Sequence, residues 1–410
     1  MTTPTKENLL LLVHRIPFPP DKGDKIRSWH LLEHLAKHYQ VHTAYFIDDK
    51  NDLQYIGKVD ALCASTCHVV LEPLQARLKS LTGLLFGRPL TLDYFHNENM
   101  RRWVDDTIAR HQIRHIVVFS SAMAQYAERH HDAMRVIDFV DIDSDKWLQY
   151  AQKKWWPLSW LYHREGTRLL QYERKIAALF DYSLFVSRQE ADLFRQLAPE
   201  SAHKTGYFSN GVDTDYFSPD VVLPCPYPPS GKNIVFTGAM DYWPNCDAVE
   251  WFARSILPLI HEQHSDAHFY IVGARPGKAV KELALLEGVT VTGTVPDVRP
   301  YLSHAHVAVA PLRIARGIQN KVLEAMSMAR TVVVTPDALE GIDAISDQEI
   351  LLAKDEVQIA AHVCNIFNGS QTDLGLAARK KMLSTYGWDA NLRAIDRILV
   401  LPATAGESRS

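Results

Sequence analysis

The sequence predicts an α/β protein with two domains, each built around a parallel sheet. Apolar runs of strand length recur between helical stretches along the chain, an alternation that favours parallel strands with helices on both faces. The pattern of strand, glycine loop and helix opens twice, at Asn8 and at Asn233. A chain of 410 residues is also long for one hydrophobic core, since cores divide beyond about 250 to 300 residues.

The composition is that of an ordinary globular protein and excludes several classes. Hydrophobic residues make up 47% and charged residues 22%, and the net charge of -4 argues against nucleic-acid binding, which needs a basic face. We expect a cytoplasmic protein, because no apolar run approaches the roughly 20 residues of a membrane span and the start lacks a signal-peptide pattern. The five cysteines form no CxxC pair and are expected as small buried hydrophobes.

The first half contains an opening strand at 8–14, a loop rich in proline and lysine, and an amphipathic helix at 28–38. Gly23, in this loop, would allow close backbone contact with a ligand, although a surface turn stiffened by prolines remains an alternative. Further strands are predicted at 41–47, 68–71, 115–119, 135–139 and 182–186, and a structural helix at 168–180.

An acidic segment, DFVDIDSDKW at 138–147, follows one of these strands. It fails as a calcium loop, because Lys146 and Gln152 stand where glycine and an acid are required, so no metal is expected. Asp141 and Asp143 are expected at the strand end, where a carboxylate accepts a hydrogen bond or a proton from an acceptor hydroxyl. Capping of a helix near Ser144 is the alternative.

Aromatic and cationic residues mix in the next segment, 151–180. Trp155, Trp156 and Trp160 stand near Lys153 and Lys154, a combination that membrane interfaces favour. A second apolar and basic patch at 74–90 would extend this surface. Packing of the aromatics between helices, with the cations in water, is the alternative.

The domain boundaries follow from composition. Residues 1–209 are expected to form the first domain and the proline-rich residues 210–232 the linker. Residues 233–386 would form the second domain, followed by a helix within 387–402.

The most informative segment is 311–342, PLRIARGIQNKVLEAMSMARTVVVTPDALEGI, which predicts a basic glycine loop, a helix at 320–329 and a buried strand. Asn320 is the expected N-cap, so the first N–H groups and the positive end of the helix dipole would form an anion site. Lys321 and Glu324 lie three residues apart on the helix and would suit a sugar nucleotide. An ordinary amphipathic helix with a solvated Lys–Glu pair is the alternative.

The motif KVLEAMSMARTVVVT resembles the signature of the retaining glycosyltransferase family 4. PLRIARGIQNKVLEAM, NGVDTDYF and VDIDSDKW more narrowly resemble bacterial sugar transferases associated with exosortase and PEP-CTERM systems, over His14 to about Trp388. The resemblance implies a GT-B fold, in which two Rossmann-like domains face each other across a cleft. It also implies a nucleoside diphosphate sugar as the donor, without a metal or other cofactor. The resemblance further implies that the second domain binds the donor nucleotide, that the first domain lies on the acceptor side, and that the helix within 387–402 crosses back onto the first domain.

The resemblance also assigns roles to residues of this chain. It implies that Lys321, Arg316 and Arg313 stabilise the leaving diphosphate and that Glu324 binds the ribose hydroxyls. Backbone contacts to the donor are expected at Gly317, Ile318, Gln319, Asn320, Gly238 and Gly23, and the turn with Val295 and Pro296 would line the base.

The chain departs from the family pattern at three places. Ser120 and Ser121 stand where many members carry a histidine, and the loop MDYWPN lacks the usual arginine and lysine. Arg316 stands where relatives have an acid, so backbone N–H groups would take over the recognition of the sugar.

The resulting hypothesis is a retaining hexosyltransferase of exopolysaccharide biosynthesis. Its acceptor would be a glycan or a polyprenyl-diphosphate-linked sugar, reached by peripheral contact with the inner face of the cytoplasmic membrane. Two alternatives are a nucleotide-sugar epimerase of the same fold and a non-catalytic scaffold subunit. The sequence offers no clear set of carboxylates and histidine for an epimerase, and a scaffold has no need to retain the cations.

Overall fold

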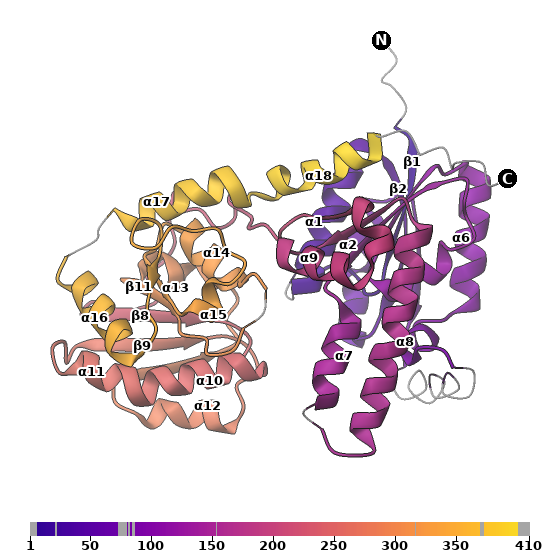
Figure 1. Cartoon of the computed structure of the whole chain (residues 1–410). Coiled ribbons are helices and arrows are strands. Elements are labelled where there is room, and N and C mark those ends of the chain that lie inside the picture. Colours follow the sequence, from indigo (N-terminus) through magenta and orange to yellow (C-terminus); the bar gives the residue numbers. More distant parts are fainter. Residues whose placement is uncertain are drawn as a thin grey trace, which may run out of the picture. The chain divides into compact units, whose positions relative to one another are not determined.

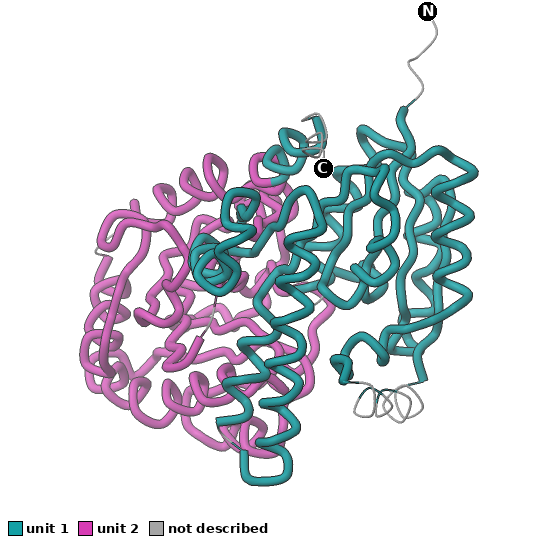
Figure 2. The backbone as a smooth tube through the Cα atoms, turned by 45° about the vertical axis from the view of Figure 1, so that its right-hand side comes forward, with its two compact units in different colours: residues 1–209, 392–410 teal, residues 210–391 magenta. Residues whose placement is uncertain are grey.

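The computed structural model describes residues 6–20, 23–72, 80, 83, 87–152, 154–315, 317–369 and 373–400. The chain divides into two units, residues 1–209 with 392–410 and residues 210–391 (Figure 2). This division falls after residue 209 and again within the last helix, α18 (Trp388–Val400). Residues 210–232, expected as a linker, belong to the second unit, where the buried Tyr227 donates a hydrogen bond to the Tyr301 carbonyl.

The first unit contains a parallel sheet of seven strands in the order β3-β2-β1-β4-β5-β6-β7 (Figure 1). The strands are β1 (Asn8–Val13), β2 (Gln40–Ile47), β3 (Ser65–Val70), β4 (His115–Phe119), β5 (Met134–Val140), β6 (Tyr182–Phe185) and β7 (Thr205–Tyr207). The helices are α1 (Gly23–His38), α2 (Ile56–Asp60), α5 (Leu90–Tyr94), α6 (Glu98–His111), α7 (Asp143–Gln152), α8 (Leu158–Leu179) and α9 (Arg188–Leu197). Short 3-10 helices lie at η1 (Lys50–Tyr55), η2 (Ser121–Tyr126) and η3 (Pro199–Lys204).

Both faces of this sheet are covered. Leu10 and Leu12 of β1 belong to a core that includes side chains of α6, α8 and α9, while Leu9 and Leu11, which point to the other face, are equally buried. Burial on both faces explains why β1 is a continuous apolar run rather than an alternating one.

The second unit contains a parallel sheet of six strands in the order β10-β9-β8-β11-β12-β13. The strands are β8 (Lys232–Thr237), β9 (Ala267–Val272), β10 (Val289–Gly293), β11 (Val307–Ala310), β12 (Val332–Val334) and β13 (Leu351–Leu352). The helices are α10 (Trp243–Trp251), α11 (Leu257–His261), α12 (Lys278–Glu282), α13 (Arg299–His304), α14 (Asn320–Ser327), α15 (Pro336–Leu339), α16 (Glu356–Phe367) and α17 (Leu374–Lys381). Short segments of other helix types are η4 (Phe252–Ile256), η5 (Leu283–Leu285) and η6 (Met382–Tyr386).

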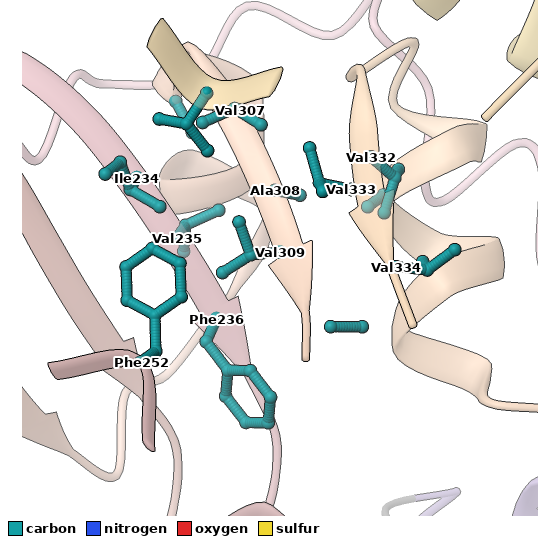
Figure 3. Close-up of a cluster of buried hydrophobic side chains, with 14 of the residues drawn as sticks. Ile234, Val235, Phe236, Phe252, Val307, Ala308, Val309, Val332, Val333 and Val334 are labelled. Carbon is teal, nitrogen blue, oxygen red and sulfur yellow. The ribbon is translucent and has the colours of Figure 1, made fainter. Parts of the chain in front are cut away.

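The core of the second unit forms around its central strands. Figure 3 shows Val235, Phe236 and Val309 of β8 and β11 beside Phe252. Val322, Leu323, Ala325 and Met326 of α14 are buried in the same core, as the helical spacing of these residues predicts. The predicted α/β fold of two parallel-sheet domains is confirmed. Among the described residues, no helix is both long and apolar enough to cross a membrane.

Candidate functional site

The segment predicted to bind the donor lies at the point where the strand order of the second sheet reverses. β8 and β11 are adjacent parallel strands. On its other side β8 pairs with β9, and on its other side β11 pairs with β12. Ligands of open α/β sheets bind outside the carboxyl ends of strands at such a point. The loop that begins at Gly238 and the loop 311–319 leave these two strand ends.

Gly238 is held by close contacts that exclude a side chain. A Cβ at this position would lie 2.8 Å from Asn245 Nδ2 and 3.3 Å from Lys321 Cε. A Cβ on Gly273 would meet the Gly238 carbonyl oxygen at 1.7 Å. The Gly238 backbone therefore lies directly against Gly273, the residue after β9, and beside the Lys321 side chain of α14.

Lys321 reaches from the first turn of α14 to Asn245, near the start of α10. Its Nζ donates a hydrogen bond of 2.5 Å to Asn245 Oδ1 and lies 4.8 Å from the centre of the Phe236 ring. Asn245 is buried, and its Nδ2 donates to the Ala239 carbonyl, which fixes the amide. Burial lowers the pKa of Lys321 to about 8, although the nearby Glu324 carboxylate opposes the shift.

Glu324 lies one turn further along α14 and is partly buried. Burial raises its pKa to about 7, although Lys321 opposes the shift. The pair therefore changes charge close to neutral pH. Two titratable groups perturbed by burial beside a glycine loop are typical of a binding or catalytic site rather than of a solvated surface pair.

The entry to α14 differs from the prediction in one detail. The N-cap residue is Gln319, in extended backbone and without a side-chain cap, and Asn320 is the first helical residue. The expectation that Asn320 caps the helix is therefore wrong, because its backbone has already entered the helix. Its Oδ1 is instead buried without a hydrogen-bond partner in the described part of the chain.

The loop before this helix requires glycine at one position. Gly317 has a φ of +65°, which only glycine adopts without strain. Ile318 packs against the core of the second unit, and Gln319 Nε2 donates to the Gly317 carbonyl. The loop is thereby fixed so that the first N–H groups of the helix, which have no partner inside the helix, lie next to Lys321.

Arg313, one of the cations predicted to bind the leaving diphosphate, is paired with an acid. The guanidinium of Arg313 forms two hydrogen bonds with Asp247, of 2.5 and 3.0 Å, and lies 5.1 Å from the Trp251 ring. Its charge is already paired with a carboxylate of α10, so the prediction of Arg313 as a phosphate ligand has no support in this geometry. Arg316 lies outside the described residues.

The other residues predicted to contact the donor are Val295, Pro296 and Gly23. Val295 packs against the core and Pro296 is exposed in the turn after β10. Gly23 is the first residue of α1, and a Cβ there would meet no described atom within 4 Å. The surroundings of Gly23 therefore do not require glycine, in contrast to those of Gly238.

The first unit carries a second group of polar residues, at the carboxyl ends of β1, β4 and β5. Two residues without glycine's freedom have positive φ here, Ser120 at +79° and Val140 at +69°. For a branched residue such as valine this conformation is strained, and such strain gathers at functional sites. A buried ion pair holds it in place, since Asp138 accepts from Arg27 at 2.7 Å and also from the Val140 N–H at 3.1 Å.

His14 is the residue of this edge that the sequence reasoning missed. It directly follows β1, stacks on Phe119, and has its Nε2 3.4 Å from Asp24 Oδ2. Its Nδ1 is buried without a partner among the described residues. Burial would raise the pKa of Asp24, but His14 and Arg15 outweigh it and hold that pKa well below its usual value. The signal was present as a polar residue at the end of a buried strand.

Asp141 and Asp143 lie at the end of β5 and the start of α7, and Lys146 connects them. Its Nζ donates to Asp141 at 2.8 Å and to Asp143 at 3.4 Å. Burial raises the pKa of Asp143, and Lys146 opposes the shift. Beneath them Glu173 is fully buried and accepts from the Ser144 hydroxyl at 2.5 Å, and burial raises its pKa to about 8.

The acidic pair does not form a metal site with other described residues. Within the described ranges one group of three possible ligands lies together, namely His34, His38 and Asp396, on α1 and α18. His34 Nε2 is 2.7 Å from Asp396 Oδ1, a hydrogen bond that attaches α18 to the first unit.

A basic pocket of about 450 Å³ also lies in the first unit, between α5, α6, η2 and α8. Tyr172, whose hydroxyl is buried, and Glu128 both line it. The pocket is lined by more cations than acids: Arg88, Arg101, Arg129, Arg168 and Lys175 against Asp93 and Glu128.

A family comparison identifies the class of the second unit. Residues 231–368 match the family model described as "Glycosyl transferases group 1". No curated protein matches the sequence with significance.

Solved structures resemble the whole chain. Sucrose-phosphate synthase from Thermosynechococcus elongatus is 18% identical with a TM-score of 0.67, over 96% of this chain and 98% of that one. Anabaena HepE in complex with UDP is 13% identical (TM-score 0.65, 96% and 99% covered). WaaG, a glycosyltransferase involved in lipopolysaccharide biosynthesis, is also 13% identical (TM-score 0.65, 96% and 100% covered). The fold is that of GT-B glycosyltransferases. Together with the match to the group 1 glycosyl transferase model, this fold defines the chain as a glycosyltransferase enzyme.

Proposed function

We propose that the protein is a retaining glycosyltransferase of family 4 that uses a nucleoside diphosphate sugar as its donor. The observation that carries the proposal is the position of Lys321 in the first turn of α14, where its side chain lies beside Gly238 of the loop after β8 and donates to Asn245 of α10. A partly buried ammonium group beside helix N–H groups suits an anion with two negative charges. The HepE structures, which hold UDP and UDP-glucose, support a donor of this chemistry.

The leaving group explains the charge of the site. When the bond between the sugar C1 and the diphosphate oxygen breaks, the diphosphate gains negative charge. We propose that Lys321, Arg316 and the N–H groups of residues 317–320 stabilise this charge in the transition state. Preorganised donors of this kind supply about 2.7 to 4 kcal/mol each.

Two oxygen atoms near Lys321 would hold donor hydroxyl groups. Glu324, once ionised, accepts hydrogen bonds from the ribose, and the unpartnered Asn320 Oδ1 accepts from a further hydroxyl of the donor. Asn320 thus gains a role different from the predicted capping. The base would lie against the turn at Val295 and Pro296.

Retention of configuration would need no protein nucleophile. In this mechanism the acceptor oxygen bonds to C1 on the face that the diphosphate leaves, and its proton passes to an oxygen of the departing diphosphate. We propose that no metal takes part, since Lys321 and the N–H groups supply the positive charge. His14 and Asp143 would orient the acceptor through hydrogen bonds in the first unit.

The basic pocket of the first unit supports an acceptor that carries phosphate. Arg88 is paired with Asp93 and Lys175 with Glu128, so Arg101, Arg129 and Arg168 are the cations of this cavity that would bind the diphosphate of a polyprenyl-linked sugar. We propose a role in exopolysaccharide biosynthesis of the exosortase and PEP-CTERM type, at the inner face of the cytoplasmic membrane. The motifs NGVDTDYF and VDIDSDKW support this narrower placement.

A donor panel tests the proposal. The protein would be incubated with UDP-, GDP- and ADP-sugars, with and without a polyprenyl-diphosphate-linked sugar and with EDTA, while release of nucleoside diphosphate is measured. We expect release from one donor that depends on the acceptor and persists in EDTA, with the same anomeric configuration in product and donor. An isomerised sugar without acceptor would indicate an epimerase, and binding without any reaction would indicate a scaffold.

A further inference from the structure

The α7–α8 hairpin projects beyond the sheet of the first unit (Figure 1). Its two helices pack tightly: a Cβ on Gly166 would lie 2.8 Å from Leu148 Cγ and 2.9 Å from the Ser144 carbonyl oxygen. Further out, the rings of Trp147 and Tyr162 are 5.2 Å apart. Close contacts along their length therefore hold the two helices of the hairpin together.

The end of this hairpin exposes large apolar side chains. Trp155 is 92% exposed and Trp156 80%. The hairpin tip is defined here as these two residues with Tyr150, Leu158 and Trp160, which are 46 to 57% exposed. Single exposed hydrophobic residues are normal, but several gathered at the end of one projection indicate an interaction surface.

The charge around the tip has one sign. Between Asp145 and Glu165 the sequence contains no acidic residue, while it contains Lys146, Lys153, Lys154 and Arg164. Lys146 is bound by Asp141 and Asp143 at the base of the hairpin, and Lys154 adjoins Trp155 at the tip. Tryptophan beside lysine is the combination that binds the interface of an anionic bilayer, with rings at the level of the headgroups and ammonium groups on phosphates.

We propose that the hairpin tip docks the first unit onto the surface of an anionic membrane. The rings of Trp155 and Trp156 enter the interface, and the neighbouring Lys154 contacts lipid phosphates. Docking itself does not depend on the proposed function. Its purpose, to bring the acceptor side of the enzyme to a lipid-linked sugar, rests on that function.

Vesicle binding by the whole protein tests this proposal. Co-sedimentation would be measured with vesicles of phosphatidylglycerol and phosphatidylcholine in equal parts and with phosphatidylcholine alone. We expect binding to the anionic vesicles that weakens as salt is raised, and little binding to the neutral ones. The double variant Trp155→Ser/Trp156→Ser should lower the partition coefficient about tenfold or more, because two exposed rings no longer enter the interface.

A matched control and a fold check accompany the double variant. Trp243→Ser removes a tryptophan that is 59% exposed in the second unit and should leave vesicle binding unchanged. The melting temperature of the double variant should equal that of the wild type, since both rings contact mainly water.

Three outcomes would overturn the proposal. These are equal vesicle binding by the double variant, no binding by the wild type, and a dimer that dissociates when the two tryptophans are replaced, which would make the tip a self-association surface. Nucleotide binding separates this proposal from the proposed function. Vesicle binding without any nucleotide binding would contradict the enzyme but not the docking, whereas the reverse result would contradict the docking alone.

Discussion

Replacement of Lys321 by alanine should lower turnover while the apparent KM for the donor changes little. In the free protein its Nζ donates to Asn245, and in the transition state it would donate to the leaving diphosphate. Loss of one preorganised donor of this kind costs about 2.7 to 4 kcal/mol, or about 10² to 10³ in kcat.

Because the pKa of Lys321 is lowered, activity should fall as the pH rises above about 8. With a pKa of about 8, Lys321 is about ten-to-one protonated at pH 7 and about one-to-ten at pH 9. Each pH unit above 8 therefore costs about 1.4 kcal/mol to charge the amine before it contacts the diphosphate. The wild type should lose kcat/KM above pH 8, and the alanine variant should lack this alkaline decline.

The assay is acceptor-dependent release of nucleoside diphosphate from pH 6 to 9.5. Lys278→Ala is the matched control, because this lysine lies in the same unit and its side chain is 91% exposed. It should retain full activity. A Lys321→Ala variant with kcat within threefold of the wild type, or with an unchanged alkaline decline, would refute the assignment of Lys321 to the leaving group.

Three further predictions concern buried charges. Glu324→Gln should weaken donor binding and abolish the rise of affinity with pH through about 7, measured by calorimetric titration, because the neutral amide no longer titrates; an unchanged pH profile would contradict it. Glu173 has a folded pKa raised from 4.5 to about 8, so the native state holds its proton longer and stability should fall by up to about 1.4 kcal/mol per pH unit between these values. Glu173→Gln should remove that slope in urea denaturation, and an identical slope would exclude Glu173 as its source. Arg27→Ala should destabilise by about 3 to 5 kcal/mol, because it leaves the Asp138 carboxylate buried and unpaired, whereas Arg174→Ala, which removes an exposed ion pair, should change stability far less; equal losses from the two would contradict this reading.

The fold was largely predictable, because burial on both faces turns parallel strands into apolar runs such as those of β1 and β8. Two short strands, β7 and β13, were not predicted. They have three and two residues, too few for a hydrophobic pattern, whereas the equally short β12 was predicted because it lies within a longer apolar run. The helix expected from Arg168 begins at Leu158 instead. Gly166 reads as a helix breaker in the sequence, but it is kept in α8 by its close contact with α7.

The candidate site was predictable where its residues are neighbours in sequence. Lys321 and Glu324 share a helix turn, so their proximity follows from the helical period. Contacts between distant segments were not predictable. Nothing in the sequence pairs Arg313 with Asp247, 66 positions apart, or places His14 against Phe119.

A crystal structure of the protein with the nucleoside diphosphate of its preferred donor would test most directly whether Lys321 binds the leaving diphosphate. We expect the terminal phosphate to lie within hydrogen-bond distance of Lys321 Nζ and of backbone N–H groups between Gly317 and Asn320. A diphosphate bound elsewhere in the second unit, with Lys321 still donating to Asn245, would contradict it.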